Sequence, residues 1–310
     1  MKIVFFGTSN VALPILEALS KQHEILAVVT RPDVKVGRKQ EIQDSPVSVL
    51  ATEMKLKILK PQKVKGNKEF YEELKNFGAD IFVVVSYGQI MPSEIINMPK
   101  YKTINVHFSV LPKYRGPSPI QFALLNGESY TGTSVFILDE KVDHGPLLAT
   151  EQIQIDADDN FLTLSQKLAY KSAAVINEVI ANYVLGKITP LPQNEALATY
   201  TKIITKADGK VDWSKTAGEI YNQFRAFYPW PGLWTTWQGK ILKITDVSVI
   251  PNVVESPLIQ KGGGVLENGV VVCAKNTFLQ IKTLQMEGKK EMTVSDFVNG
   301  NRNFLGSLLG

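Results

Sequence analysis

The sequence predicts a two-domain α/β protein, in which a larger domain with a mainly parallel sheet precedes a smaller C-terminal β-barrel domain. The chain has 310 residues, 44% of them apolar, which is enough for about two hydrophobic cores. Its first half alternates short β-branched runs with helical patterns, as parallel sheets flanked by helices do. Its last third has short strand-like runs separated by glycines, which are typical of a small barrel.

The N-terminal domain is expected to be Rossmann-like, with both faces of its sheet covered. Residues 3–6 and 81–85 are continuously apolar, as strands are when helices cover both faces. The expected strands are 2–6, 25–30, 80–85, 101–106 and 132–138, and the expected helices are 10–20, 46–54, 67–77 and 118–126. A long helix at 161–184 with one apolar side completes the domain.

The composition changes between residues 186 and 212, where prolines and polar residues follow the long helix. We therefore predict a catalytic domain at 1–188, a linker at 189–206 and a barrel domain at 207–310. In the barrel domain the pattern predicts a helix at about 215–227. The expected strands there are 234–237, 240–249, 264–266, 269–273 and 277–284.

Composition excludes several classes of protein. The single cysteine, Cys273, rules out an internal disulfide and a cysteine-based zinc site, and its apolar neighbours predict a buried thiol. The N-terminal apolar run covers only residues 3–6, which is too short for a signal peptide. The run at 81–85 has the length of a strand, whereas a membrane-spanning helix needs about 20 apolar residues. We expect a soluble cytoplasmic protein.

The net charge of +4 lies entirely in the last third of the chain. Residues 1–200 carry 21 basic and 21 acidic residues, whereas residues 201–310 carry 13 and 9. A basic surface raises the rate of encounter with phosphates and so permits a polyanionic partner. An excess of this size also serves solubility, and charge alone slightly favours that interpretation.

The first candidate catalytic residues are Asn105 and His107, at the end of a predicted strand. Open α/β sheets bind ligands at the carboxyl edge of their strands. Side chains on a strand repeat every two residues, so these two leave the sheet on the same side. A lone histidine is usually structural, but its pairing with an amide at a strand end favours a functional site.

A third candidate, Asp143, follows the strand predicted at 132–138. It can reach His107 if the strands 101–106 and 132–138 are neighbours, which would give an imidazole oriented by a carboxylate. A plain surface turn explains Asp143, His144 and Gly145 as well, and is favoured by the local pattern alone. The sequence has no nucleophile elbow, and its three histidines have no metal-ligand spacing. We therefore expect neither a covalent nor a zinc mechanism.

Two loops of the first domain are candidates for phosphate contact. Residues 7–9 lie where α/β folds place phosphates, but a GxGxxG motif is absent, and capping of the next helix by Ser9 or Asn10 explains the segment at least as well. Residues 31–46 form a polar loop much longer than the usual 2 to 6 residues. Its basic side chains at Lys35, Arg38 and Lys39 suit phosphate contact, and a solvated loop is about equally compatible with the pattern.

These segments together resemble a known family. The stretches 6–9, 105–117 and 143–145 look like the formyltransferases that use 10-formyltetrahydrofolate. Further segments resemble the members of that family that formylate initiator methionyl-tRNA, namely 37–38, 45–46, 208–213, 225–232 and 288–290. The similarity extends nearly from end to end of the chain.

The resemblance implies roles for residues and partners. The family's catalytic Asn, His and Asp fall on Asn105, His107 and Asp143. Its folate-contacting run falls on Ser109, Val110, Leu111 and Pro112. The loop with Lys35, Arg38 and Lys39 corresponds to a tRNA-binding loop. The resemblance also implies an oligonucleotide-binding-type barrel, 10-formyltetrahydrofolate as co-substrate, initiator methionyl-tRNA as acceptor, and no metal; we expect a monomer that does not bind membranes.

Other functions stay open at this point. A formyltransferase acting on an amino-sugar nucleotide, or a formyltetrahydrofolate hydrolase, would share the Asn-His-Asp residues, and only the basic loop and the C-terminal segments oppose them. A dehydrogenase is disfavoured by the missing GxGxxG motif. A non-catalytic nucleic-acid-binding module would leave Asn105 and His107 without a role.

Overall fold

The structure is a computed structural model that describes residues 1–36, 41–250 and 261–310, and the chain forms two compact units. The first unit contains Met1–Pro119, Tyr130–Ile155 and Leu164–Lys202. The second contains Ile120–Ser129, Asp156–Thr163 and Ile203–Gly310. Two short segments within the predicted catalytic domain thus belong to the second unit, and most of the segment predicted as a linker belongs to the first.

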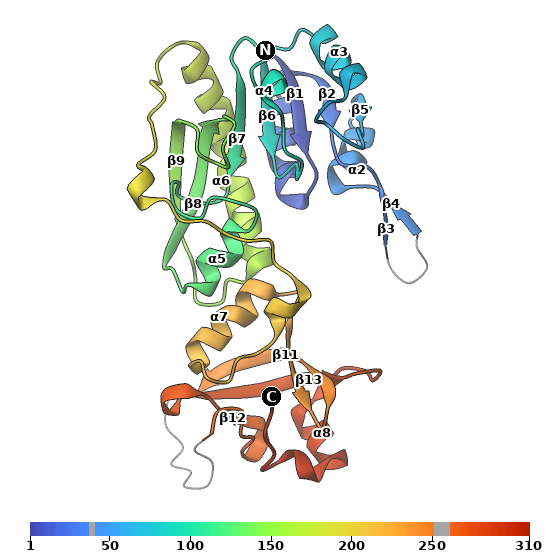
Figure 1. Cartoon of the computed structure of the whole chain (residues 1–310), viewed down its shortest axis with the longest axis vertical. Helices are drawn as coiled ribbons and strands as arrows, with labels where there is room; N and C mark the ends of the chain where they lie inside the picture. The colour runs from blue at the N-terminus through green and yellow to red at the C-terminus, as the bar shows by residue number, and fades with distance from the viewer. Residues whose placement is uncertain (37–40, 251–260) are drawn as a thin grey trace. The chain divides into compact units, whose positions relative to one another are not determined.

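A seven-stranded sheet forms the centre of the first unit, in the order β5-β2-β1-β6-β7-β8-β9 (Figure 1). Its strands are β1 (Lys2–Gly7), β2 (Glu24–Val29), β5 (Ile58–Leu59), β6 (Ile81–Val85), β7 (Thr103–His107), β8 (Tyr130–Ile137) and β9 (Leu147–Gln154). The pairs from β5 to β7 are parallel, whereas β8 runs antiparallel to both β7 and β9. The predicted mainly parallel α/β class is confirmed.

Helices are present near every position predicted for this part of the chain, and a short helix at Ser93–Ile96 that was not predicted is also present. They are α1 (Leu13–Ser20), α2 (Pro46–Glu53), α3 (Lys68–Asn76), α4 (Ser93–Ile96), α5 (Pro119–Leu125) and α6 (Phe161–Val184). Two of them begin at side-chain caps: Ser45 accepts a hydrogen bond from the Ser48 amide, and Asn67 accepts one from the Phe70 amide. The predicted 31–46 loop contains two short antiparallel strands, β3 (Val34–Val36) and β4 (Glu41–Gln43).

The core of the first unit lies against the central strands. Every residue of β6 is buried, as is every residue of β1 after Lys2. On this sheet the ring of Phe6 packs 5.3 Å from that of Phe82 and 5.5 Å from that of Tyr87, centre to centre. Burying one such side chain stabilises the fold by roughly 1.5–3 kcal/mol, so this cluster holds β1 and β6 together beneath the edge that carries the candidate site.

The second unit is built on a five-stranded antiparallel half-barrel, in the order β10-β11-β13-β12 with β14 paired to β13. Its strands are β10 (Leu233–Trp237), β11 (Lys240–Ile250), β12 (Val270–Val272), β13 (Phe278–Met286) and β14 (Met292–Thr293), and its later helices are α7 (Ala217–Phe227) and α8 (Val294–Gly300). The strand predicted at 264–266 is replaced by single bridges from Gly264 to Leu308 and from Val265 to Val271. The rings of Trp237, Phe297 and Phe304 meet edge to face in its core.

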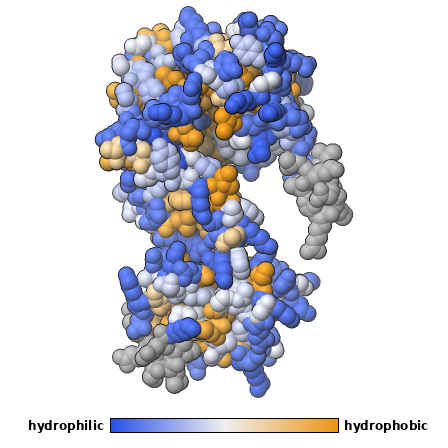
Figure 2. All heavy atoms as spheres, in the orientation of Figure 1, coloured by the Kyte–Doolittle hydropathy of each residue, from blue (hydrophilic) through white to orange (hydrophobic). Residues whose placement is uncertain are grey.

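Two predictions about surface and burial can be checked directly. Cys273 is buried, and burial raises the pKa of its thiol to about 12, which makes it a poor nucleophile. Among the described residues, no helix is both long and apolar enough to span a bilayer. On the face shown in Figure 2 most side chains are hydrophilic and the apolar ones lie in small groups.

Candidate active site

Asn105 and His107 lie at the carboxyl end of β7, next to β6 on one side and β8 on the other. Asn105 pairs with Val84 of β6 and with Phe136 of β8, while His107 is opposite Ser134. Because β1, β6 and β7 are parallel, their carboxyl ends meet at one edge of the sheet. Both candidate side chains therefore stand where ligands bind in this class of fold.

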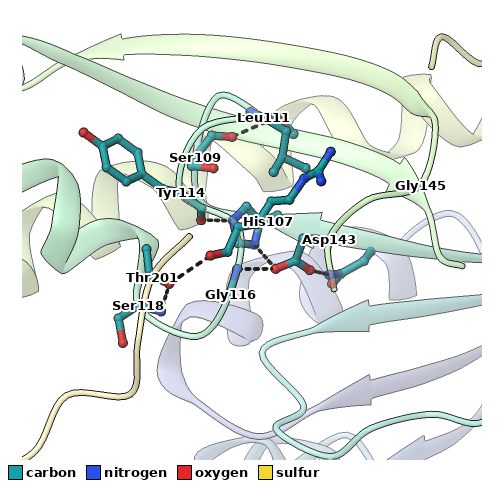
Figure 3. A network of polar contacts seen from close by, with 12 residues as sticks. His107, Ser109, Leu111, Tyr114, Gly116, Ser118, Asp143, Gly145 and Thr201 are labelled. Carbon is teal, nitrogen blue, oxygen red and sulfur yellow. Dashed lines mark hydrogen bonds and ion pairs between the residues drawn. The ribbon is translucent and has the colours of Figure 1, made fainter. Parts of the chain in front are cut away.

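The carboxylate of Asp143 joins these two residues, although it comes from the loop between β8 and β9. Its Oδ2 lies 3.6 Å from His107 Nδ1, and its Oδ1 lies 3.5 Å from Asn105 Nδ2. The backbone amide of Gly116 donates a hydrogen bond of 2.7 Å to the same Oδ2 (Figure 3). The predicted proximity of Asp143 and His107 is present. Asp143 does lie in a turn, but its carboxylate is largely buried and faces His107.

The backbone around Asp143 is tightly constrained. Asp143 itself has φ +47°, a left-handed conformation that costs a non-glycine residue of order 1–3 kcal/mol. Two residues later, a Cβ on Gly145 would lie 1.8 Å from the carbonyl oxygen of Ile137, so only glycine fits there. Gly116 has φ +107°, and a Cβ on it would lie 2.8 Å from Thr201 Oγ1. Glycine thus lets the Asp143 loop close tightly against the end of β8, and lets Thr201 pack against the backbone that donates to the carboxylate.

His107 is held on both sides of its ring. Its side chain is only 7% exposed, and its Nε2 lies 2.9 Å from the carbonyl oxygen of Tyr114, to which an N–H donates (Figure 3). Nδ1 faces the carboxylate of Asp143. Since both ring nitrogens face oxygen atoms, the imidazole has a fixed orientation, and it can donate protons on both sides when it is protonated.

The predicted folate-contacting run follows β7 as a tight loop attached to β8. Ser109 Oγ donates to the carbonyl of Lys113 at 2.6 Å. Ser134 Oγ donates to the carbonyl of Ser109 at 2.8 Å and accepts from the amide of Leu111 at 3.1 Å. The run Ser109, Val110, Leu111 and Pro112 is thus rigidly placed beside His107; its contact with a ligand stays a prediction.

The turn after β1 is anchored to the turn after β6. Thr8 Oγ1 donates to the carbonyl of Tyr87 at 2.9 Å, and Ser9 Oγ donates to Ser86 Oγ at 2.8 Å. Ser9 precedes a short 3₁₀ helix (Asn10–Ala12) but its side chain makes no capping bond, so the capping interpretation was wrong for this residue. The hydroxyls instead hold two strand ends together at the edge that carries Asn105.

The basic loop is described only at its base. Lys35 lies in β3, whereas Arg38 and Lys39 lie outside the described residues. At the base, Lys60 Nζ contacts Asp33 Oδ1 at 2.6 Å and Asp44 Oδ1 at 2.5 Å, so one ammonium group ties together the residues that flank the hairpin. The tRNA-binding role of Lys35, Arg38 and Lys39 stays a prediction.

His144, next to the catalytic candidate, has different partners. Its Nδ1 lies 2.5 Å from Asp139 Oδ2 and its Nε2 lies 3.5 Å from Glu195 Oε1. His107 and His144 therefore belong to separate histidine-carboxylate pairs. Within the described part of the chain, no group of three or more His, Cys, Asp or Glu residues is arranged to hold a metal ion.

Comparison with known proteins decides the family. Residues 1–180 match the formyl transferase family model, and residues 203–302 match the model of the formyl transferase C-terminal domain. A methionyl-tRNA formyltransferase from Caldicellulosiruptor saccharolyticus is 40% identical over 316 residues, which cover 100% of both chains. The chain belongs to the methionyl-tRNA formyltransferase family. A second member, from Dictyoglomus turgidum, is 41% identical over 99% of this chain and 98% of its own.

Solved structures of more distant formyltransferases share the fold of this family member. An N-formyltransferase from Helicobacter canadensis, in complex with folinic acid and dTDP-3-aminofucose, aligns with a TM-score of 0.67 at 20% identity, over 94% of this chain and 100% of its own. HypX from Aquifex aeolicus, in complex with tetrahydrofolic acid, aligns with a TM-score of 0.62 at 16% identity, over 99% of this chain and 48% of its own. At these identities the likeness concerns the fold alone.

Two residues at the site have no counterpart in the sequence-based hypothesis. Arg115 is fully buried, and Gln193 reaches the loop that carries Asp143. Arg115 lies within the family-like stretch 105–117, but its partners are about 80 residues away in the chain. The position of Gln193 beside prolines predicted only a linker, because no local pattern indicates such a distant contact.

Proposed function

We propose that this protein transfers the formyl group of 10-formyltetrahydrofolate to the α-amine of methionyl-initiator tRNA. The observation that carries the proposal is the cluster of Asn105, His107 and Asp143 at a strand edge, in a chain that aligns over its whole length with methionyl-tRNA formyltransferases. The product is N-formylmethionyl-tRNA, which serves translation initiation.

The reaction exchanges one carbon–nitrogen bond for another. The amine nitrogen attacks the formyl carbon, and the formyl oxygen becomes an oxyanion. The carbon–N10 bond of the folate then breaks, the amide carbonyl re-forms, and the proton lost by the amine ends on N10. An α-amino group has a pKa of about 7.7–8.0, so a useful neutral fraction exists at pH 7. The enzyme's main tasks are to position the substrates and to stabilise the oxyanion.

The three site residues divide these tasks. One N–H of the Asn105 amide is directed at Asp143, which leaves the second to donate to the formyl oxygen. His107 in its protonated form donates to the same oxygen once the Tyr114 carbonyl is exchanged for it at Nε2. Asp143 stabilises the imidazolium and helps proton transfer toward the departing folate nitrogen. The proposal involves no metal ion.

Other parts of the chain bind the two substrates. We assign folate contact to the loop containing Ser109, Val110, Leu111 and Pro112, whose attachment to Ser134 supports a preorganised site. We assign contact with the tRNA acceptor end to Lys35, Arg38 and Lys39. We assign holding of the tRNA to the domain at 207–310, because the basic excess of the chain lies after residue 200. The enzyme is expected to be cytoplasmic and to act as a monomer. Light scattering with and without tRNA tests the monomeric state.

One assay with three arms tests the reaction. The protein is incubated with 10-formyltetrahydrofolate and charged initiator tRNA, an amino-sugar nucleotide, or no acceptor. Acid-gel mobility of the tRNA should change in the first arm. Formylation of the sugar nucleotide alone would identify a sugar formyltransferase, and equally fast loss of the formyl group without acceptor would identify a hydrolase. Either of these results refutes the proposed acceptor.

A further inference from the structure

Arg115 is a buried cation whose side-chain partners, within the described part of the chain, come from the segment 189–202. Its Nη1 and Nη2 donate to the two carboxylate oxygens of Glu195 at 3.0 and 2.6 Å. Its Nε and Nη2 donate to Oε1 of Gln193 at 3.1 and 2.8 Å. Nη1 also lies 3.1 Å from the hydroxyl of Tyr200. A fully buried guanidinium is tolerated only when paired in this way, so the segment is fastened to the catalytic loop.

Gln193 connects this guanidinium to the loop that carries the catalytic carboxylate. Because its Oε1 faces the Arg115 donors, its amide nitrogen points the other way. That nitrogen donates to the carbonyl of Asp143 at 2.9 Å and to the carbonyl of Gly145 at 2.8 Å. One side chain therefore satisfies two backbone carbonyls on either side of His144.

The loop that contains Arg115 also holds the carboxylate of Asp143. Gly116, the residue after Arg115, donates its amide to Asp143 Oδ2 (Figure 3). The backbone of Arg115 is itself paired, since its amide donates to the carbonyl of Thr199 at 2.8 Å and its carbonyl accepts from the amide of Thr201 at 2.7 Å. Asp143 is thus held through its main chain by Gln193 and through its side chain by Gly116, which balances the cost of its left-handed conformation.

We propose that Gln193, itself held by Arg115, is a positioning residue that keeps Asp143 in its catalytic orientation toward His107. Gln193 then serves the catalytic site, although it lies in the segment that connects the two units. Glu195 in turn pairs with Arg115. Glu195 suits this role because the hydrogen bond from Arg115 holds the pKa of its carboxyl below the ordinary value, so it stays ionised. The inference rests on the proposed function, from which Asp143 takes its role.

Steady-state kinetics of two neighbouring variants test the inference. Gln193→Ala removes both bonds to the Asp143 loop, and we expect kcat to fall about 10- to 100-fold, because a misplacement of about 1 Å has such a cost. KM for tRNA and for the folate should stay within about twofold. The matched control, Asn194→Ala, removes a capping bond to Ala196 on the exposed side of the same segment and should leave kcat unchanged.

A conservative variant separates the bonds that position the Asp143 loop from the bond between Gln193 and Arg115. Gln193→Glu keeps an oxygen for Arg115 but turns a carboxylate toward two carbonyls, so kcat should fall at least as far as in Gln193→Ala. Melting temperatures of all variants are compared in parallel. The inference is overturned if Gln193→Ala lowers the melting temperature and leaves kcat equal to that of Asn194→Ala, or if only KM rises.

A measurement without turnover keeps the inference separate from the proposed function. The chain has three histidines, so ¹⁵N-labelled imidazole resonances can be assigned by substitution. We expect Gln193→Ala to shift the His107 resonances and Asn194→Ala to leave them unchanged. Lack of tRNA formylation by the unmodified protein would refute the proposed function, while unchanged His107 resonances in Gln193→Ala would refute the positioning role.

Discussion

The two units use buried residues in contrasting ways. In the first unit, polar side chains such as His107, Arg115 and Ser134 are buried around the candidate site and contact loops that are distant in the chain. In the second unit, a cluster of buried apolar side chains forms the core, in which the rings of Phe297 and Phe304 lie 5.1 Å apart, centre to centre. Polar networks impose geometry, whereas apolar packing contributes stability with little directional preference. Substitutions in the two units should therefore separate activity from stability.

The largest effect is expected at the strand end of the first unit. Asn105→Ala and His107→Ala should each lower turnover by about 10² or more, because each removes a preorganised donor to the oxyanion. The control is Thr103→Val on the same strand, since the buried Thr103 hydroxyl has no hydrogen-bond partner among the described residues. Turnover and melting temperature are measured together. Near-normal turnover in both alanine variants would contradict the assignment.

The next effect concerns the stability of the second unit. Phe304→Ala should cost about 3–5 kcal/mol, as large-to-alanine changes in packed cores do, and the exposed Leu308→Ala should cost far less. All four tryptophans lie between residues 213 and 237, so their fluorescence during urea unfolding reports on this unit. A lower midpoint with folate binding intact is the expected result. Equal midpoints for the two variants would show that the aromatic cluster does not carry this stability.

The sequence predicts those features of the site that follow from the regular alternation of side chains along a strand. Asn105 and His107 were placed on one face because strand side chains alternate. The contact with Asp143 was expected only on condition that two strands are neighbours, and the pairing of β7 with β8 meets that condition. Gln193 could not be predicted, since its bonds to Asp143 and Gly145 join residues about 50 positions apart. The orientation of His107 Nε2 toward a backbone carbonyl depends equally on a turn whose shape no pattern encodes.

Some elements were missed for physical reasons. β9 alternates buried or half-buried positions with more exposed ones and is rich in Gln, Glu and Thr, as an edge strand with one solvated face is, and so it lacks the apolar run used to find strands. α8 has only seven residues and begins at the cap Thr293, whose hydroxyl accepts from the Asp296 amide. Short capped helices of this kind owe their stability to packing, which Phe297 provides here.

A moderate effect is expected at the basic loop, to which we assign contact with the tRNA. Arg38→Ala should lower kcat/KM for charged tRNA about 10- to 100-fold, because one charged hydrogen bond contributes about 1.5–3 kcal/mol. Folate affinity should not change. The exposed Lys65→Ala removes the same charge from another part of the first unit and serves as the control. A fall in folate affinity with normal tRNA use would assign the loop to the other substrate.

The salt dependence of tRNA binding gives a second test of the tRNA contacts assigned to the two units. Binding of tRNA by the full chain should weaken as salt rises, with a log-log slope of about −0.7 to −0.9 for each neutralised phosphate. Arg38→Ala should make the slope shallower by about one such contact, whereas Lys65→Ala should leave it unchanged. A slope near zero for the unmodified protein would reduce the basic excess after residue 200 to a solubility feature.

The smallest effect on stability is expected from ion pairs at the surface, of which each unit has an example. In the first unit, the hydrogen bond from Lys60 holds the pKa of Asp44 below its ordinary value, and in the second, Lys282 lies 3.9 Å from Asp246. Because the pKa of Asp44 is lowered, its contact with Lys60 stabilises the base of the hairpin above about pH 4. This stabilisation is lost as the pH falls through the lowered pKa. Lys60→Met should raise the pKa of Asp44 toward the ordinary value, as read from its carboxyl ¹³C shift, while Lys282→Met should not change it. Equal titration curves in Lys60→Met and the unmodified protein would show that the contact does not hold the base of the basic loop.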